Sequence, residues 1–283
     1  MIQALDHIAL VVHDLDAAVD GYGRLFGRTS NWRGDMLGAS QAWFQFGNMA
    51  LDVIAPTGDG PTGDAIRARL ASHGEGVYGV GFAVPDLAAA GKRLERLGAP
   101  TFAREEVTTN PDTGATRGWK IANIHGKATH GVNLFLVEQA PGAERWPTAP
   151  ATVDEGSSVA GLDHVVIRTP NPDRAAALYG ARLGLDMRLD RSNPDWGTRL
   201  MFFRVGDLVV EIAHDLKAGV SSGPDEAWGL SWRVADVEAA HHRMAGQRVE
   251  VSEIRKGRKP GTRVFTVKGA PGAVPTIVIG PES

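Results

Sequence analysis

The chain has 283 residues, of which 43% are hydrophobic and 22% charged, as in a globular protein of about two domains. The formal net charge of −3 gives no electrostatic reason to expect nucleic acid or an anionic membrane as a partner. Zero cysteines exclude disulfides, thiol catalysis and thiolate metal ligands. No uncharged run approaches the length of a membrane span and no basic leader is visible, so we expect a cytoplasmic protein.

The first predicted strand covers residues 5–12, where a histidine, His7, lies among alternating aliphatic residues. The alternation places His7 with Ala9 and Val11, on the face opposite the one that packs against helices. Asp14 is suited to cap a helix that follows, and Gly27 to end it. The apolar residues between them recur at helical spacing: Leu15, Ala18, Val19, Tyr22, Leu25 and Phe26.

This strand-helix unit occurs four times along the chain. Residues 162–169 repeat the first strand, with His164 in the place of His7, and Asn171 and Pro172 then open a helix. Shorter copies begin at Gly79 and Gly229. After the helices of the first and third copies, alternating runs separated by glycine turns at 47–48 and 206–207 indicate antiparallel strands. The repeated unit is therefore βαβββ.

Residues 139–158 separate the second copy from the third. They are rich in Pro, Ala, Gly and charge and lack periodicity, which is typical of a linker. The prediction is an α+β protein with one domain at residues 1–138 and another at 159–283, each built from two units.

Four such units, opened by Leu-Asp-His, resemble the vicinal oxygen chelate superfamily, which includes glyoxalase I, methylmalonyl-CoA epimerase, extradiol dioxygenases and the fosfomycin and bleomycin resistance proteins. Residues 118–137 resemble the last two strands of methylmalonyl-CoA epimerases, so the N-terminal half is most similar to epimerase-like proteins. The resemblance implies that each pair of units forms a half-open, glyoxalase-like barrel. It also implies a divalent metal inside the barrel: Zn, Fe, Mn, Co or Ni.

In that superfamily a histidine on the first strand of a unit and a Glu or Gln on its last strand hold the metal. Transferred residue by residue, the resemblance assigns His7 and Asp52 in the first unit and His164 and Glu211 in the third. These are the predicted metal ligands.

The second and fourth units depart from the superfamily pattern. Gly79 and Phe135 stand at the ligand positions of the second unit, and Gly229 and an aliphatic residue near Ile277 or Val278 at those of the fourth. Each half therefore retains two ligands, below the three protein ligands of a catalytic zinc or non-haem iron site.

Three interpretations of the two histidine-acid pairs are open. In the first, the first and third units pair with each other and their side chains share one metal ion. In the second, each histidine-acid pair works without metal, with His7 and His164 as catalytic acid or base. In the third, the pairs are inactive remnants, hydrogen-bonded inside a barrel that binds a ligand without catalysing a reaction.

Other residues suggest contacts with a substrate. Lys127, in the epimerase-like segment, suits a carboxylate or phosphate, or is simply a charge on a solvated hairpin. Trp43, Tyr78 and Phe135 suggest an aromatic-lined ligand cavity, with ordinary core packing as the alternative. A basic run at 255–263 is either a solvated loop or a dock for an acidic tail. The glycines at 74–81 lead into a strand rather than a helix, so we expect no nucleotide cofactor.

The resemblance implies a small-molecule enzyme of the glyoxalase, epimerase or dioxygenase type that acts on an oxygen-rich substrate, with metal assistance left open. The alternative is a non-catalytic protein that sequesters a small molecule, as resistance proteins do. The expected partner is a small molecule, with no nucleic acid or membrane, and a homodimer is left open.

Overall fold

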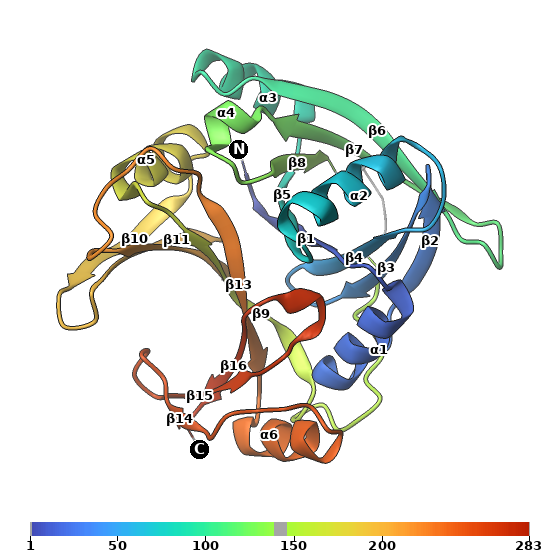
Figure 1. Ribbon diagram of the computed structural model, residues 1–283, viewed down its shortest axis with the longest axis vertical. Coiled ribbons are helices and arrows are strands. Elements are labelled where there is room, and N and C mark those ends of the chain that lie inside the picture. Colours follow the sequence, from blue (N-terminus) through green and yellow to red (C-terminus); the bar gives the residue numbers. More distant parts are fainter. Residues whose placement is uncertain (1, 139–145, 283) are drawn as a thin grey trace.

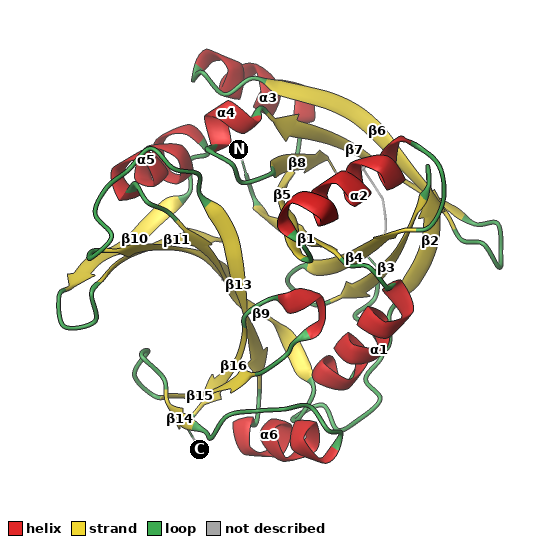
Figure 2. Ribbon diagram, viewed as in Figure 1, coloured by secondary structure: helices red, strands yellow, loops and turns green. Residues whose placement is uncertain are grey.

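The computed structural model describes residues 2–138 and 146–282. Within these residues the strands form two eight-stranded sheets, one from each half of the chain, and the helices lie mainly around them (Figures 1 and 2). The mixed α+β class and the repeated units agree with the sequence analysis.

The first sheet is a closed barrel, whereas the resemblance implied a half-open one. β1 runs parallel to β4 and antiparallel to β5, so the first and second units meet at their first strands. The barrel is closed where β2 meets β6, through the pairing of Asp35 with Thr109. In spatial order its strands are β1 (Ala4–Val11), β4 (Ala50–Pro56), β3 (Ala39–Gln45), β2 (Trp32–Met36), β6 (Thr101–Thr109), β7 (Thr116–Ile124), β8 (Leu134–Glu138) and β5 (Gly76–Val84).

The second sheet is curved but open, since its outer strands β10 and β14 do not pair with each other. The third and fourth units meet at β9 and β13, which run antiparallel. His7 and His164 therefore lie in separate sheets. In spatial order the strands are β10 (Asp186–Asn193), β11 (Thr198–Val205), β12 (Leu208–Asp215), β9 (Val159–Arg168), β13 (Glu226–Val234), β16 (Thr276–Pro281), β15 (Thr262–Val267) and β14 (Arg255–Lys256).

The helices begin and end at residues suited to those places. Asp14 accepts a hydrogen bond from the Ala17 amide at the start of the first helix, and Gly27 ends it with φ of 66°, as predicted. Asn171 caps the helix that begins at Pro172. No helix of the described chain is both long and apolar enough to cross a membrane. The helices are α1 (Leu15–Phe26), α2 (Pro61–His73), α3 (Leu87–Arg96), α4 (Gly126–Thr129), α5 (Pro172–Ala176), the π-helix η1 (Ala177–Arg182), α6 (Val237–Gly246) and the 3₁₀-helix η2 (Pro271–Ala273).

The helix α2 is an insertion between the first two units that the sequence analysis did not predict. Its Ile66 and Leu70 pack against Ala9, Val11 and Ile54, which lie on the face of the first sheet that points into the barrel. Because α2 buries only one narrow stripe of apolar residues, its sequence shows little of the apolar periodicity that predicts a helix. The insertion adds a hydrophobic cover over residues on this inner face.

The two halves share one hydrophobic core. Trp232 of β13 is fully buried, and its ring lies 4.7 Å from that of Phe26 and 5.2 Å from that of Phe46, both from the first half. Buried Arg28 donates hydrogen bonds to the carbonyls of Val159 (2.7 Å) and Ala149 (2.8 Å). The second sheet is thus fixed against the first by packing and by buried polar contacts.

The predicted linker at residues 139–158 is partly outside the described residues, since 139–145 are not included. Its described part packs against the first half: Trp146 contacts the rings of Trp32 and Trp43, and the Ala149 amide donates to the Gln45 carbonyl.

Candidate active site

A β-bulge next to each of the two histidines brings an aspartate against it. Along β1, Leu5 faces Phe82 and His7 faces Gly81, which leaves Asp6 as the extra residue. A bulge of this kind turns a side chain away from strict alternation. Asp6 Oδ1 consequently lies 2.7 Å from His7 Nδ1.

The same device recurs in the second sheet. Along β9, Leu162 faces Trp232 and His164 faces Ser231, so Asp163 is the extra residue. Its Oδ2 lies 2.8 Å from His164 Nδ1. Because an ionised carboxylate only accepts hydrogen bonds, Nδ1 carries the proton and Nε2 is left as the reactive nitrogen.

His164 Nε2 faces a second carboxylate in the open sheet. Glu211 Oε2, on β12, lies 3.5 Å away, and the side chains of His164 and Glu211 are 15% and 14% exposed. Asp163, His164 and Glu211 therefore form a carboxylate-imidazole-carboxylate chain that solvent reaches. The arrangement is suited to proton transfer, with one acid orienting the imidazole and the other beside its free nitrogen.

Arg233 completes the environment of Asp163. Its Nε lies 2.9 Å from Asp163 Oδ1, and its Nη1 lies 3.0 Å from Asp207 Oδ2. Burial by itself raises the pKa of Asp163, but the hydrogen bonds and charges of His164 and Arg233 outweigh it and lower the pKa to about 2. Asp163 thus remains an acceptor for His164 over the physiological pH range.

The corresponding pair in the closed barrel is buried among aromatic rings. His7 lies between Trp43 and Phe135, with ring centroids 4.8 and 5.0 Å away, and Trp43 faces Asp52 across β3 and β4. His7 is 7% exposed and Asp52 4%. Trp119 stacks on Trp43, with ring centroids 5.2 Å apart. The interior around His7 is therefore filled by packing.

The surroundings of Asp52 and His7 in the closed barrel shift the pKa values of both groups. Burial raises the pKa of Asp52 to about 7, although the charge of His7 partly opposes the shift. Burial by itself lowers the pKa of His7, but its hydrogen bond with Asp6 and the charges of Asp6 and Asp52 raise it above the ordinary value. Asp52 Oδ1 is also buried without a hydrogen bond to any described residue, as are the side-chain nitrogens of Gln41 and Trp43.

Phe135 occupies the space in which a further ligand of the closed barrel would lie. A Cβ atom at Gly79 would lie 2.8 Å from Phe135 Cε1, and one at Gly81 would lie 2.5 Å from Cε2. Separations below 3 Å are steric clashes. The space beneath the Phe135 ring therefore accommodates glycine at both positions and no larger side chain. A histidine at position 79 is incompatible with Phe135 as it is placed.

The donor set does not fit a resident catalytic metal. Among residues 2–138 and 146–282, no group of three or more His, Asp or Glu side chains is placed to hold an ion. In the second sheet the position corresponding to Gly79 is Gly229, where a Cβ would lie 3.0 Å from the Pro275 carbonyl oxygen. His164 and Glu211 supply two ligands where catalytic sites use about three.

The structure groups only some of the predicted substrate contacts. Trp43 and Phe135 lie beside His7, whereas Tyr78 packs beside the α2 contact at Ala9 and Ile54. Lys127 is exposed on α4, outside the group around His7.

The sequence analysis did not assign a role to Asp6, Asp163 or Arg233. The Asp-His pair appears in both halves of the sequence, and that repetition was the available signal for the aspartates. Strict strand alternation would place each aspartate on the face opposite its histidine. Because the bulges break this alternation, the contact between aspartate and histidine could not be predicted from the pattern. Arg233 lies far from His164 in sequence and carried no signal.

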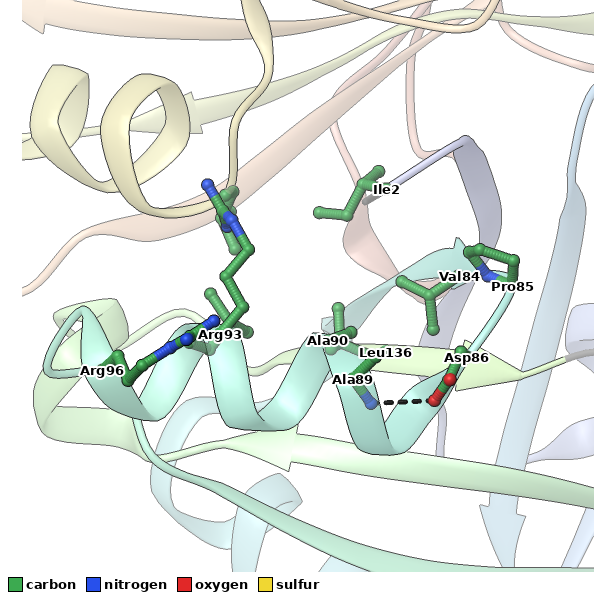
Figure 3. A pocket seen from close by; sticks show the side chains of 11 residues that line it. Ile2, Val84, Pro85, Asp86, Ala89, Ala90, Arg93, Arg96 and Leu136 are labelled. Atoms are coloured by element: carbon green, nitrogen blue, oxygen red, sulfur yellow. Dashed lines mark hydrogen bonds between the residues drawn. The ribbon is translucent and has the colours of Figure 1, made fainter.

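Two cavities lie where the halves meet, away from both histidine-acid pairs. One of about 290 Å³ lies between α3, Ile2 and Leu183 (Figure 3). Arg93 extends from α3 beside this cavity and donates to the Arg182 carbonyl at 2.5 Å. The other, of about 510 Å³, lies between α1 and the segment around η2. The residues lining them contain none of the predicted metal ligands.

Comparison with solved structures finds folds that match over the whole chain. A triple mutant of 4-hydroxymandelate synthase from Streptomyces coelicolor matches with a TM-score of 0.68 and 13% identity, covering 100% of this chain and 93% of the other. The Mn(II)-bound glyoxalase from Novosphingobium aromaticivorans matches with a TM-score of 0.67 and 14% identity, covering 100% and 83%. At these identities the likeness concerns the fold.

A shorter match concerns half of the chain. A single-site variant of methylmalonyl-CoA epimerase from Streptomyces coelicolor is 26% identical with a TM-score of 0.41, covering 50% of this chain and 100% of the epimerase. No curated protein matches the sequence.

A family model described as the Glyoxalase/Bleomycin resistance protein/Dioxygenase superfamily matches residues 6–122 and 163–266. The matched segments contain both histidine-acid pairs and span most of each half. Together with the repeated βαβββ units, this confirms the resemblance on which the sequence analysis relied. The chain belongs to the glyoxalase, bleomycin resistance protein and dioxygenase superfamily.

Proposed function

We propose that this protein is a small-molecule enzyme that transfers protons at the uncovered face of its second sheet. His164 is the general acid or base, Glu211 is its proton partner, and Asp163 is a positioning residue. The observation that carries the proposal is the Asp163-His164-Glu211 chain, with separations of 2.8 and 3.5 Å and partial solvent exposure.

The chemistry of these groups supports a specific class of reaction. An imidazole whose Nδ1-H is held by Asp163 presents the Nε2 lone pair to a substrate. Such a base removes a proton from carbon next to a carbonyl group, and the imidazolium then returns it to carbon or to a leaving group. Glu211 stabilises the imidazolium between these steps. The products are those of an isomerase or a lyase.

The donor set favours this chemistry over an iron-dependent oxygenation. A non-haem iron site of the common type uses two histidines and one carboxylate, and the second sheet offers only His164 and Glu211 at the matching positions.

We assign the closed barrel to support rather than to chemistry. His7 lies between two aromatic rings, and Phe135 covers the glycines where further side chains would enter. A substrate would have to displace this packing to reach His7 Nε2. The open sheet requires no such rearrangement.

The test is solvent deuterium exchange into carbon acids. The protein is incubated in D₂O with a panel of 2-oxo acids, acyl thioesters and their esters, and NMR follows exchange beside the carbonyl group. We expect exchange with at least one compound, reduced about 10²- to 10⁴-fold in His164→Gln. His242→Gln, on the exposed side of α6, is the matched control and keeps the wild-type rate.

Two results would overturn the proposal. One is exchange that persists in His164→Gln. The other is a purified protein that carries about one transition ion per chain, loses it in His164→Ala and loses activity with it, since the chemistry would then depend on the metal.

The second candidate function is binding without catalysis, favoured by the aromatic rings around His7. Binding of an aromatic compound that quenches tryptophan fluorescence, unchanged in His164→Gln and lost in Trp43→Ala, together with no exchange in any compound, would favour this function over the enzyme.

A further inference from the structure

The two outer strands of the open second sheet do not pair, and a side-chain contact joins the turns beside them. We use the word seam for the unpaired boundary between β10 and β14. Trp196, in the turn after β10, and Arg258, in the turn after β14, come together there, with the guanidinium carbon 4.6 Å from the indole centroid. Figure 1 shows the two turns reaching toward each other at the open side of the sheet.

Both turns are held by their own hydrogen bonds. The Trp196 amide donates to Asn193 Oδ1 at 3.1 Å, and the Leu216 amide donates to the Gly197 carbonyl at 2.9 Å. On the other side, the Gly257 amide donates to the Thr262 carbonyl at 2.7 Å. The contact between Trp196 and Arg258 therefore joins two defined turns.

The seam differs from the equivalent boundary in the first half. There β2 and β6 pair through Asp35 and Thr109, and the barrel is closed. A cation-π contact at an exposed site is weak, and Trp196 is 51% exposed. The second sheet is therefore joined more weakly at this boundary than the first sheet is at its own.

Positive charge is concentrated at the seam. The turn at 194–197 and the segment 255–261, which consists of β14 and the turn after it, contain one acid, Asp195, and four exposed cations: Arg255, Lys256, Arg258 and Lys259. Within the described chain, the only ion pair formed by these cations joins Lys256 to Glu282 at 4.0 Å. The remaining charge is available to an anion.

We propose that the seam is the entrance to the His164 site and that the substrate is an organic anion whose carboxylate or phosphate group is held by Arg258 and Lys259. The location of the chemistry rests on the proposed function. Trp196 then offers its ring face to the organic part of the same molecule, and Arg258 exchanges its contact with the indole for one with the acidic group.

The test measures anion binding by isothermal titration calorimetry at low ionic strength. Pyrophosphate and malonate are the probes, one for a phosphate and one for a carboxylate source. We expect at least one to bind the full-length protein, with at least a tenfold weaker affinity in Arg258→Ala and weaker binding as salt is added. Lys92 is exposed on α3 and serves as the control. Lys92→Ala removes the same charge away from the seam and is expected to leave the affinity unchanged.

The outcomes separate this inference from the proposed function. His164→Gln is expected to bind the probe as the wild type does, because anion capture does not need proton transfer. Exchange that is absent in the wild-type protein, or that persists in His164→Gln, together with Arg258-dependent binding of the probe, would contradict the proposed function alone. If neither probe binds the wild type, or if Arg258→Ala and Lys92→Ala bind equally, the inference is overturned.

Discussion

At the scale of single residues, Asp52 carries the clearest consequence of burial. Its pKa rises from an ordinary 3.8 to about 7, so the folded chain keeps a carboxyl proton that the unfolded chain releases above about pH 4. The stability contributed by this proton is complete below pH 4 and is lost as the pH rises toward 7.

We predict that Asp52→Asn flattens the pH dependence of stability between pH 4 and 6. In this window the wild-type free energy of unfolding falls by at most about 1.4 kcal/mol per pH unit on account of Asp52, and the variant lacks that loss. Urea unfolding at several pH values measures the slope. Asp163→Asn is the comparison: the pKa of Asp163 is lowered to about 2, so the stability it contributes is complete above about pH 4 and the pH dependence it causes lies below that value. Equal slopes in wild type and Asp52→Asn would contradict the prediction.

The sequence predicted which histidines and acids share a strand face, but not how they are used. Ile8 and Leu10 belong to the main hydrophobic core, and His7 lies on the opposite face of the strand, as alternation indicated. Alternation did not predict that Asp6 and Asp163 turn toward the histidines, since a bulge depends on register with a strand far away in sequence.

At the scale of elements, the contact between β5 and β8 explains the altered ligand positions. Gly81 faces Phe135 in parallel register, and the phenyl ring lies over both Gly81 and Gly79. The two glycines and the aromatic residue are therefore one packing unit. The sequence analysis placed Gly79 and Phe135 at the two altered ligand positions but did not predict that the phenyl ring packs over the glycines.

We predict that Gly81→Ala destabilises the protein by about 1–3 kcal/mol through overpacking against Phe135. The cost is expected to shrink in a Phe135→Leu background, so that a double-mutant cycle measured by urea unfolding shows coupling. Gly47→Ala is the control, because nothing lies within 4 Å of its added methyl group. Additive effects of Gly81→Ala and Phe135→Leu would mean that the ring is not the obstacle.

Barrel closure and the helix α2 were the parts of the fold that the sequence did not predict. Closure depends on the pairing of Asp35 with Thr109, whose strands belong to different units. The α2 helix buries only a narrow apolar stripe around Ile66 and Leu70, which is too little for periodicity to reveal. Repeats, caps and turns, by contrast, are local features and were predicted.

At the scale of the whole molecule, the halves are joined by a common core centred on Trp232. This residue belongs to the second sheet but packs on Phe26 and Phe46 of the first half. Each half by itself would expose these rings. The two sheets are therefore expected to unfold together.

We predict that Trp232→Ala lowers the free energy of unfolding by about 3–5 kcal/mol and leaves a single transition. Trp232→Phe keeps an aromatic ring and removes a buried indole N–H that has no partner among the described residues, so its cost is smaller. Coincident urea curves from circular dichroism and fluorescence are the measurement. Separate transitions would mean that the halves are independent.

The openness of the second sheet leaves it with two free rims of backbone donors and acceptors, which the closed first barrel lacks. Such rims invite other chains to add strands and start aggregates. Here the rim strands carry alternating charge on one side, at Arg188 and Asp190, and paired cations on the other, at Arg255 and Lys256. Burying these charges against a neighbouring chain is costly, which opposes the addition of a foreign strand at either rim.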